Sequence, residues 1–387
     1  MNIGIDIRPL MSKNRTGVGE YTYELLNAVF KIDKANQYFL FYNSYQDVST
    51  NMPKWDQNNV HLVATHYPNK LLSVNLKIFG WPKLDKTIIK NFKLETRNLD
   101  VFFSPNLNFT SVSLNTKFIL TIHDLSFEFF PEFFSLKQRL WHRAVNPKKQ
   151  CERANIILTP SENTKRDVVE CYKINPDKIQ VLYPGLAPIF STPPIKDPAS
   201  LGMIKKKYNL PDKYILFLGT VEARKNVIGL IKAFEKAHPR LPADFYLIIA
   251  GAPGFGYEEI YEYAQKSSYK EKIKFIDYID AADKPSLYAS ARLFIYPSFY
   301  EGFGFPILEA MASGIPIITS NRTSLTEITG SSEYLINPNN PDQIAEAMVK
   351  ILNSPELQKE QIKNGLIEAE HFSWQNAAEN FQKIISS

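Results

Sequence analysis

Residues 292–320 read RLFIYPSFYEGFGFPILEAMASGIPIITS, and this stretch decides the fold. Two short apolar runs rich in β-branched and aromatic residues, 293–296 and 315–318, flank a glycine-bearing loop and an apolar helical segment. Pro306 suits the first position of that helix, because its φ is fixed and its missing N–H would have no partner there. The pattern predicts strand, loop, helix and strand, as in a parallel sheet covered by helices.

The same alternation fills both halves of the 387 residues. It begins with MNIGIDI and GEYTYELLNAVFKI and restarts with YILFLGT and VIGLIKAFEKA, after a stretch interrupted by prolines 184, 188, 193, 194 and 198. A chain of this length is too long for one core of ordinary size. We therefore predict an α/β protein with two doubly wound, Rossmann-like parallel-sheet domains. Their expected bounds are 1–187 and 213–372, with a linker at 188–212 and a last helix, 373–387, that packs back on the first domain.

The composition limits where the protein works. Only two cysteines are present, Cys151 and Cys171, far fewer than a disulfide-stapled secreted protein carries, so we expect thiols in a reducing compartment. The first residues, MNIGIDIRPLMS, lack a basic flank followed by an apolar core, and no run approaches the roughly 18 to 20 apolar residues of a spanning helix. We expect a cytoplasmic protein without a transmembrane segment.

The net charge of +5 is unevenly distributed. Residues 1–190 hold 24 Lys and Arg against 17 Asp and Glu, which suggests an anionic neighbour: membrane lipid, a diphosphate-linked acceptor or nucleic acid. Two basic stretches in this half, 67–93 and 131–149, also contain large apolar residues such as Trp81 and Trp141. They fit either an interfacial surface or helices with a solvated basic face and a buried aromatic face. Nucleic acid is not favoured, because the basic residues are diffuse and no reader motif is present.

Two glutamates, Glu301 and Glu309, flank the loop in the opening stretch. One interpretation is that Glu309 complements the positive end of the helix and Glu301 is a solvated loop acid. In the other interpretation, Gly302 and Gly304 let backbone N–H groups approach a phosphate at the helix end, while the two carboxylates accept hydrogen bonds from sugar hydroxyls. This second combination suits a ligand with a phosphate centre and a sugar on each side.

The chain resembles a known family over nearly its whole length. The opening stretch looks like the E-x7-E region of the family 4 (group 1) retaining glycosyltransferases, and further matching landmarks are TGVGEYTYELLNAV, TIHDLSF, ILTPSENTKRDV, VLYPG, FLGTVEARKN and FSWQNAAENF. The resemblance implies the GT-B fold, in which two Rossmann-like domains face a central cleft. It makes Glu301 the donor-sugar contact and Glu309 the ribose contact. The backbone that would hold the diphosphate and hexose is that of Gly302, Phe303, Gly304 and Phe305.

A second landmark, the loop containing EARKN, supplies cations. A diphosphate leaving group gains negative charge as its glycosidic bond breaks, and Arg and Lys can stabilise that charge without a metal. Lys225 matches the family lysine. The family's usual arginine, directly after the glycine, is replaced by Thr220, so we expect Arg224 to serve instead, as in a mannosyltransferase-like subset with a similar loop.

Other candidates come from both halves. His123 follows a buried strand, and the resemblance places it beside the donor hexose, although a lone histidine is often structural. The loop RTGVGEYT should bring Gly17 and Gly19 to the ligand, unless it is an ordinary tight turn. The family places the nucleotide base near Tyr278 and Ile279. We expect His123, Glu301, Arg224 and Lys225 to act in catalysis and the other candidates to bind the donor.

The predicted activity is transfer of a hexose with retention, preferably mannose from GDP-mannose, to a glycan or polyprenyl-diphosphate-linked acceptor, as in O-antigen or polysaccharide synthesis. No cluster of His, Cys and carboxylates has metal-ligand spacing, so we expect no metal and no cofactor. The enzyme would work in the cytoplasm, with a peripheral contact to the inner face of the cell membrane if the basic stretches are interfacial. The alternatives are a nucleotide-sugar 2-epimerase of the same fold and a non-catalytic glycan- or lipid-binding scaffold.

Overall fold

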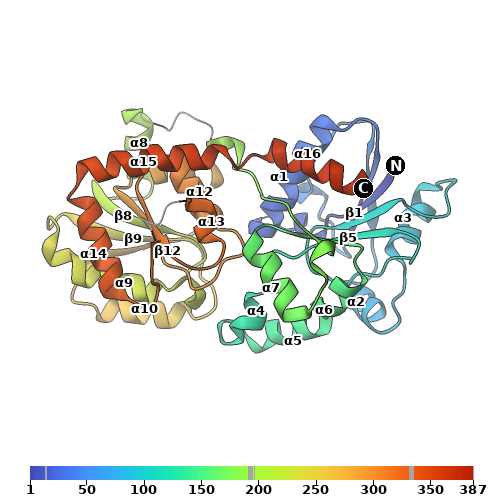
Figure 1. Ribbon diagram of the computed structural model, residues 1–387, viewed down its shortest axis with the longest axis horizontal. Coiled ribbons are helices and arrows are strands. Elements are labelled where there is room, and N and C mark those ends of the chain that lie inside the picture. Colours follow the sequence, from blue (N-terminus) through green and yellow to red (C-terminus); the bar gives the residue numbers. More distant parts are fainter. Residues whose placement is uncertain (14, 191–194, 196, 331–334, 387) are drawn as a thin grey trace. The chain divides into compact units, whose positions relative to one another are not determined.

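The computed structural model describes residues 1–13, 15–190, 195, 197–330 and 335–386. The chain forms two compact units (Figure 1). Unit 1 comprises Met1–Leu125, Leu136–Gly185 and Ser373–Ser387, and unit 2 comprises Ser126–Ser135 and Leu186–Phe372. Neither unit is a continuous piece of chain. Pro193 and Pro194 of the expected linker lie outside the described residues.

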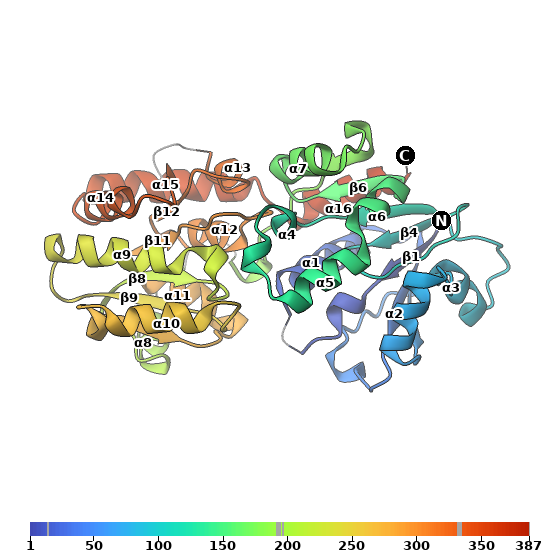
Figure 2. The same ribbon diagram turned by 90° about the horizontal axis from the view of Figure 1, so that it is seen from below.

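Unit 1 is built on a parallel sheet with the strand order β3-β2-β1-β4-β5-β6-β7. Its strands are β1 (Asn2–Asp6), β2 (Gln37–Asn43), β3 (Val60–Thr65), β4 (Val101–Ser104), β5 (Lys117–Thr121), β6 (Ile156–Thr159) and β7 (Ile179–Val181). Its helices are α1 (Gly17–Ile32), α2 (Asn69–Ile78), α3 (Leu84–Phe92), α5 (Leu136–Val145), α6 (Pro147–Arg153), α7 (Glu162–Tyr172) and α16 (Trp374–Ser386). Helices cover both faces of the sheet, so the strands are apolar on both sides (Figures 1 and 2).

Unit 2 has a parallel sheet of strand order β10-β9-β8-β11-β12-β13. Its strands are β8 (Lys213–Leu218), β9 (Phe245–Ala250), β10 (Ile273–Ile276), β11 (Leu293–Tyr296), β12 (Ile317–Ser320) and β13 (Leu335–Ile336). Its helices are α4 (Ser126–Phe129), α8 (Pro198–Lys207), α9 (Val227–Ala237), α10 (Tyr257–Lys266), α11 (Lys284–Ser290), α12 (Phe305–Ala312), α13 (Leu325–Thr329), α14 (Pro341–Leu352) and α15 (Pro355–Glu370). The predicted fold class, α/β with two Rossmann-like parallel sheets, is confirmed.

The strand order of unit 2 reverses between β8 and β11. From β8 the chain builds outward through β9 and β10, then crosses back to place β11 on the other side of β8. The loops after β8 and β11 therefore leave neighbouring strands and diverge. Such a switch point at the carboxyl ends of parallel strands is where open α/β sheets bind ligands.

The structure differs from the expected linker at 188–212. Pro188 begins a short 3₁₀ turn and Pro198 begins α8, which packs on α11 within unit 2. A proline is tolerated at the first position of a helix, because the N–H that it lacks would have no intrahelical partner there. The prolines thus start helices where the sequence suggested an interruption.

A second difference concerns residues 126–135, which were expected in the first domain but belong to unit 2. Aromatic side chains hold this segment in place. The ring of Phe133 stacks on that of Phe299, with centroids 5.9 Å apart, and Phe129 and Phe130 each lie 5.9 Å from Tyr300. We call residues 126–135 the aromatic strap.

The C-terminal helix α16 belongs to unit 1 and lies beside α1 in both views (Figures 1 and 2). The rings of Trp374 and Tyr21 meet at an angle of 68°, and Phe381 packs on Phe103 with ring centroids 4.8 Å apart. Lys117 Nζ also donates to the carbonyl of Ile384 at 3.2 Å. The core of unit 1 therefore includes residues more than 180 positions beyond its last strand, β7.

Candidate functional site

Two loops of unit 2 meet at the switch point between β8 and β11. The first runs from the end of β8 through the 3₁₀ turn Ala223–Lys225 to Asn226, which adopts a left-handed conformation (φ 57°) before α9 begins. The second, 297–304, leads from β11 to α12. The Phe299 N–H donates to the Arg224 carbonyl at 3.0 Å, so the backbones of the two loops are joined.

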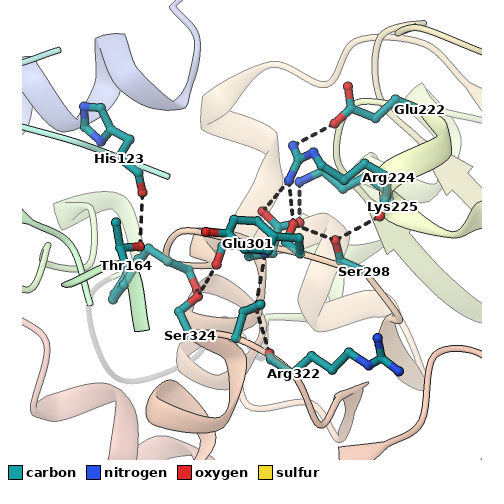
Figure 3. Close-up of polar contacts among 12 residues, drawn as sticks. His123, Thr164, Glu222, Arg224, Lys225, Ser298, Glu301, Arg322 and Ser324 are labelled. Atoms are coloured by element: carbon teal, nitrogen blue, oxygen red, sulfur yellow. Dashed lines mark hydrogen bonds and ion pairs between the residues drawn. The ribbon is translucent and has the colours of Figure 1, made fainter. Parts of the chain in front are cut away.

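Glu301 lies between two cations of the first loop (Figure 3). Its Oε1 forms an ion pair with Lys225 Nζ, and its Oε2 lies 3.3 Å from Arg224 Nη1. Arg224 is itself held by Glu222 at 2.7 Å and by the carbonyl of Tyr300 at 2.6 Å. The side chains of Lys225, Glu301 and Arg224 are only 8, 10 and 15 % exposed, so these charges are largely shielded from water.

The electrostatics of the cluster favour the carboxylate form of Glu301. Burial by itself would raise its pKa, but the charges of Lys225 and Arg224 outweigh burial and lower the pKa to about 2. Glu301 is therefore ionised at neutral pH. A buried charge of this kind persists because it is paired on both oxygens.

The backbone around Glu301 is fixed by the loop after β12. The Glu301 N–H donates to Thr323 Oγ1 at 3.2 Å, and Ser324 Oγ lies 2.9 Å from the Glu301 carbonyl and 2.6 Å from that of Phe303. Ser298 adds a contact from its hydroxyl to the Arg224 carbonyl at 3.2 Å. Sequence reasoning missed Ser298, Thr323 and Ser324. The only feature of the sequence that could have indicated them is their position shortly after the neighbouring strands β11 and β12.

Helix α12 begins at Phe305, one residue before the predicted start, with Gly304 as its N-cap. Gly304 has a φ of 118°, and a Cβ atom there would come within 2.6 Å of Leu325 Cδ2, so only glycine fits. As a glycine, the N-cap residue Gly304 has no side chain that could cap the N-terminus of α12. Its backbone N–H groups and helix dipole favour an anion at this position.

Glu309 lies in the second turn of α12 rather than in the first. Its Oε2 accepts a hydrogen bond from the hydroxyl of Tyr288 at 2.9 Å, and its Oε1 lies 3.3 Å from Lys284 Nζ. Both partners belong to α11. Glu301 and Glu309 are thus both buried and paired, and the interpretation of them as a solvated acid and a helix-end charge is wrong.

The two candidate base contacts differ in exposure. Tyr278 is 50 % exposed, whereas the side chain of Ile279 belongs to the core of unit 2. A base could therefore contact the Tyr278 side chain but only the backbone of Ile279. The loop is supported by Asp283, which accepts a hydrogen bond from the Tyr208 hydroxyl at 2.6 Å at the end of α8.

His123 belongs to unit 1 and follows β5. Its Nε2 lies 2.8 Å from the Pro105 carbonyl, which can only accept, so Nε2 carries the proton. Burial lowers the pKa of His123, which favours the neutral ring with Nδ1 as an acceptor. Its ring meets Tyr21 edge-on, and its carbonyl accepts a hydrogen bond from Thr164 Oγ1 at 3.5 Å (Figure 3).

Gly17 and Gly19 do not lie in a loop before the first helix. They form the first turn of α1, because Thr16 acts as its N-cap and accepts a hydrogen bond from the Gly19 N–H at 3.4 Å. This backbone group is therefore already engaged within the helix. Within the described ranges, no group of three or more His, Cys, Asp and Glu side chains is arranged to hold a metal ion.

Two family models match the chain. The model described as glycosyl transferases group 1 matches residues 203–367, and the model described as glycosyltransferase family 4 matches residues 15–188. The two matches are separated by residues 189–202, shortly after the boundary between Gly185 and Leu186. Each covers most of the sheet of one unit.

Individual proteins resemble the chain to different extents. The O-antigen chain mannosyltransferase B of Escherichia coli is 29 % identical over 367 residues, with 93 % of each chain covered. The serotype-specific mannosyltransferase WbdA of Escherichia coli is 30 % identical over 250 residues, which are 63 % of this chain and 30 % of that protein. The crystal structure of Anabaena Alr3699/HepE in complex with UDP and glucose superposes with a TM-score of 0.72 at 16 % identity, with 100 % and 99 % of the two chains covered. This last likeness shows the fold alone, which is GT-B.

Proposed function

The chain belongs to the group 1 and family 4 glycosyltransferases, and from this premise we propose that it transfers mannose from GDP-mannose to a growing glycan with retention of configuration. The similarity to O-antigen chain mannosyltransferase B supports mannose as the sugar and an O-antigen-type polysaccharide as the product. The acceptor would be a glycan carried on a polyprenyl diphosphate. Neither an epimerase nor a binding scaffold is favoured by these relatives.

The observation that carries the proposal is the charge cluster around Glu301. Lys225 and Arg224 lie on the loop after β8, the loop after β11 ends at the N-terminus of α12, and all three groups favour a diphosphate. Glu301 would accept hydrogen bonds from hydroxyls of the donor hexose. As the bond from the anomeric carbon to the diphosphate breaks, the cations stabilise the charge that develops on the leaving oxygen.

The reaction would proceed on the front face of the sugar. The acceptor hydroxyl forms the new bond to the anomeric carbon, and its proton passes to the departing diphosphate oxygen. A nucleoside diphosphate leaves, and the configuration is retained. We propose that no metal and no cofactor take part, because Lys225 and Arg224 can supply the positive charge that the leaving group needs.

A lipid-linked acceptor requires an approach to a membrane, and α2 offers a surface for it. Leu72 and Leu76 lie on the buried face of α2. Leu71, Val74 and Ile78 form a second apolar stripe on the same helix, and their side chains are 48 to 64 % exposed. Phe79 and Trp81 continue this stripe and are 73 and 65 % exposed. We call these five exposed residues the α2 ridge.

The charges beside the α2 ridge suit an anionic membrane surface. At 100° per residue, Lys70 and Lys77 lie on one flank of the stripe. Both are exposed, and an apolar ridge with a lysine flank is typical of interfacial helices. In the described part of the chain, no helix is both long and apolar enough to cross a membrane. We propose a peripheral contact at the cytoplasmic face, where the scarcity of cysteine also fits a reducing compartment.

Calorimetric titration with GDP, UDP, ADP, TDP and CMP, each with and without EDTA, tests the donor site directly. We expect GDP to bind and EDTA to leave its affinity unchanged. Product analysis with GDP-mannose and a lipid-linked acceptor then tests transfer. Conversion of the nucleotide-sugar without acceptor would support the epimerase, and failure of every nucleotide to bind would favour the scaffold.

A further inference from the structure

Glu309 is buried between two helices, and its carboxylate is held on both oxygens. The hydroxyl of Tyr288 donates to Oε2 at 2.9 Å, and Lys284 Nζ lies 3.3 Å from Oε1. The Glu309 side chain is still 12 % exposed, so a ligand can reach it. A carboxylate offers about four lone-pair sites. Two hydrogen-bonded partners therefore leave acceptor capacity for hydroxyl groups from outside.

Tyr288 is fixed in place by its own packing. It is fully buried, and its ring lies edge-on to Phe294 and Phe190, with centroids 5.2 and 6.0 Å away. Such a ring cannot turn its hydroxyl away from Glu309 without disturbing the core. The hydroxyl therefore sets the plane of the carboxylate rather than following it.

Lys284 contributes charge instead of rigidity. It lies at the first position of α11, is 31 % exposed and faces the carboxylate oxygen that Tyr288 does not hold. The Lys284 ammonium and the Tyr288 hydroxyl therefore hold opposite oxygens of the same carboxylate.

From this arrangement we propose that Tyr288 and Lys284 are positioning residues, which orient the Glu309 carboxylate by holding both of its oxygens, so that it accepts hydrogen bonds from a vicinal diol of the nucleotide ribose. The inference rests on the proposed donor site. It adds the two residues of α11 that make Glu309 selective for a ribose over a deoxyribose. A correctly oriented acceptor rejects a ligand that lacks the hydroxyl, because the buried carboxylate then loses a partner.

The test compares GDP with 2′-deoxy-GDP and 3′-deoxy-GDP by calorimetry, and UDP with its deoxy forms in parallel. The wild-type protein should bind the preferred ribonucleotide about tenfold or more tightly than its deoxy form. In Tyr288→Phe this ratio should fall to about threefold or less, mainly through weaker binding of the ribonucleotide. Lys284→Met should lower the ratio as well, and Lys284→Arg should restore it.

Tyr214→Phe is the matched control. Tyr214 is also fully buried, and its hydroxyl donates to the carbonyl of Leu287, the residue beside Tyr288, at 2.7 Å. Both substitutions therefore remove one buried tyrosine hydroxyl that contacts α11, but only Tyr288 contacts Glu309. The control should keep the wild-type ratio while losing a similar amount of thermal stability.

Each result has a distinct meaning. If the wild-type protein binds no nucleoside diphosphate, the proposed function fails and this inference with it. If it binds ribo and deoxy forms equally, Glu309 does not recognise the ribose and the inference alone is overturned. An unchanged ratio in Tyr288→Phe, or an equal loss of selectivity in Tyr214→Phe, also overturns the inference.

Discussion

Lys225 and Glu301 form a buried ion pair in which the cation suited to a diphosphate is held by the carboxylate suited to a sugar. Glu301 thus acts as an internal counter-ion for Lys225 and Arg224. A diphosphate that binds these cations must compete with it. The carboxylate then becomes available for the hydroxyls of the donor sugar.

The first prediction is that Glu301→Gln separates binding from catalysis. Transfer should fall by roughly 10² to 10³-fold, because Glu301 is the carboxylate that we propose contacts the reacting sugar. GDP should nevertheless bind more tightly than to the wild-type protein, because the competing anion has gone. Calorimetry and a transfer assay measure both effects. The control is Glu222→Gln, which also removes a negative charge beside Arg224 but leaves Glu301 in place, so transfer should persist. Weaker GDP binding in Glu301→Gln would contradict the counter-ion role.

The second prediction concerns the stability of the pair. Lys225→Met should destabilise the fold by about 3 to 5 kcal/mol, because it leaves Glu301 buried with one partner fewer. The double variant Lys225→Met/Glu301→Gln should recover a large part of this loss of stability, since no unpaired charge of the pair remains, while transfer stays at least as low as in Glu301→Gln. Urea unfolding of the single and double variants measures the coupling. Strictly additive losses would mean that the two side chains do not stabilise each other.

The third prediction is a specific dependence of stability on pH. The pKa of Glu301 lies at about 2 in the folded protein, below its ordinary value of 4.5. Its ionised form therefore contributes about 3 kcal/mol above pH 4.5, and this contribution is lost as the pH falls from 4.5 toward 2. The unfolding free energy of Glu301→Gln should change less steeply than that of the wild-type protein in this window. Parallel curves for the two proteins would show that Glu301 does not titrate as inferred.

The fourth prediction tests the α2 ridge. Ile78→Ser and Trp81→Ser should each weaken binding to phosphatidylglycerol vesicles by about tenfold or more, because burial of such a side chain in the bilayer interface contributes roughly 1.5 to 3 kcal/mol. Both side chains are exposed, so thermal stability should remain close to that of the wild-type protein. Co-sedimentation with vesicles measures the effect. Leu114→Ser, at a side chain 91 % exposed outside the ridge, is the control and should bind vesicles normally. Equal loss in all three variants would rule out a specific role for the ridge.

The fold and the centre of the site could be predicted from the sequence because local patterns determine them. Apolar runs followed by glycine-bearing loops mark parallel strands, and strands of such a sheet bring their C-terminal loops together. Together with the family resemblance, this placed Lys225 and Glu301 in one site although 76 positions separate them. The position of Pro306 after the glycine-bearing loop also predicted the start of α12 to within one residue.

Other features depend on contacts that a local pattern does not contain. In KPSLYASA, Tyr288 is indistinguishable from a core residue, and only the packing of α11 on α12 brings its hydroxyl to Glu309. Gly17 and Gly19 were misplaced because glycines suggest a loop, whereas Thr16 caps a helix that includes them. The sequence analysis did not assign the aromatic strap to unit 2, because aromatic residues alone do not indicate on which unit they pack.

The discontinuity of both units limits how genes of this family can be recombined. The chain passes between the units at residues 125/126, 135/136, 185/186 and 372/373. A chimaera made by a single exchange near residue 185 would take residues 1–185 from one relative and the remaining residues from another. Unit 2 would then lack its own aromatic strap, and α16 would pack on a unit 1 from a different protein. The surface of Phe299 and Tyr300 would then face a strap that did not evolve with it. Functional exchange of donor specificity therefore requires residues 126–135 and 186–372 to be inherited together.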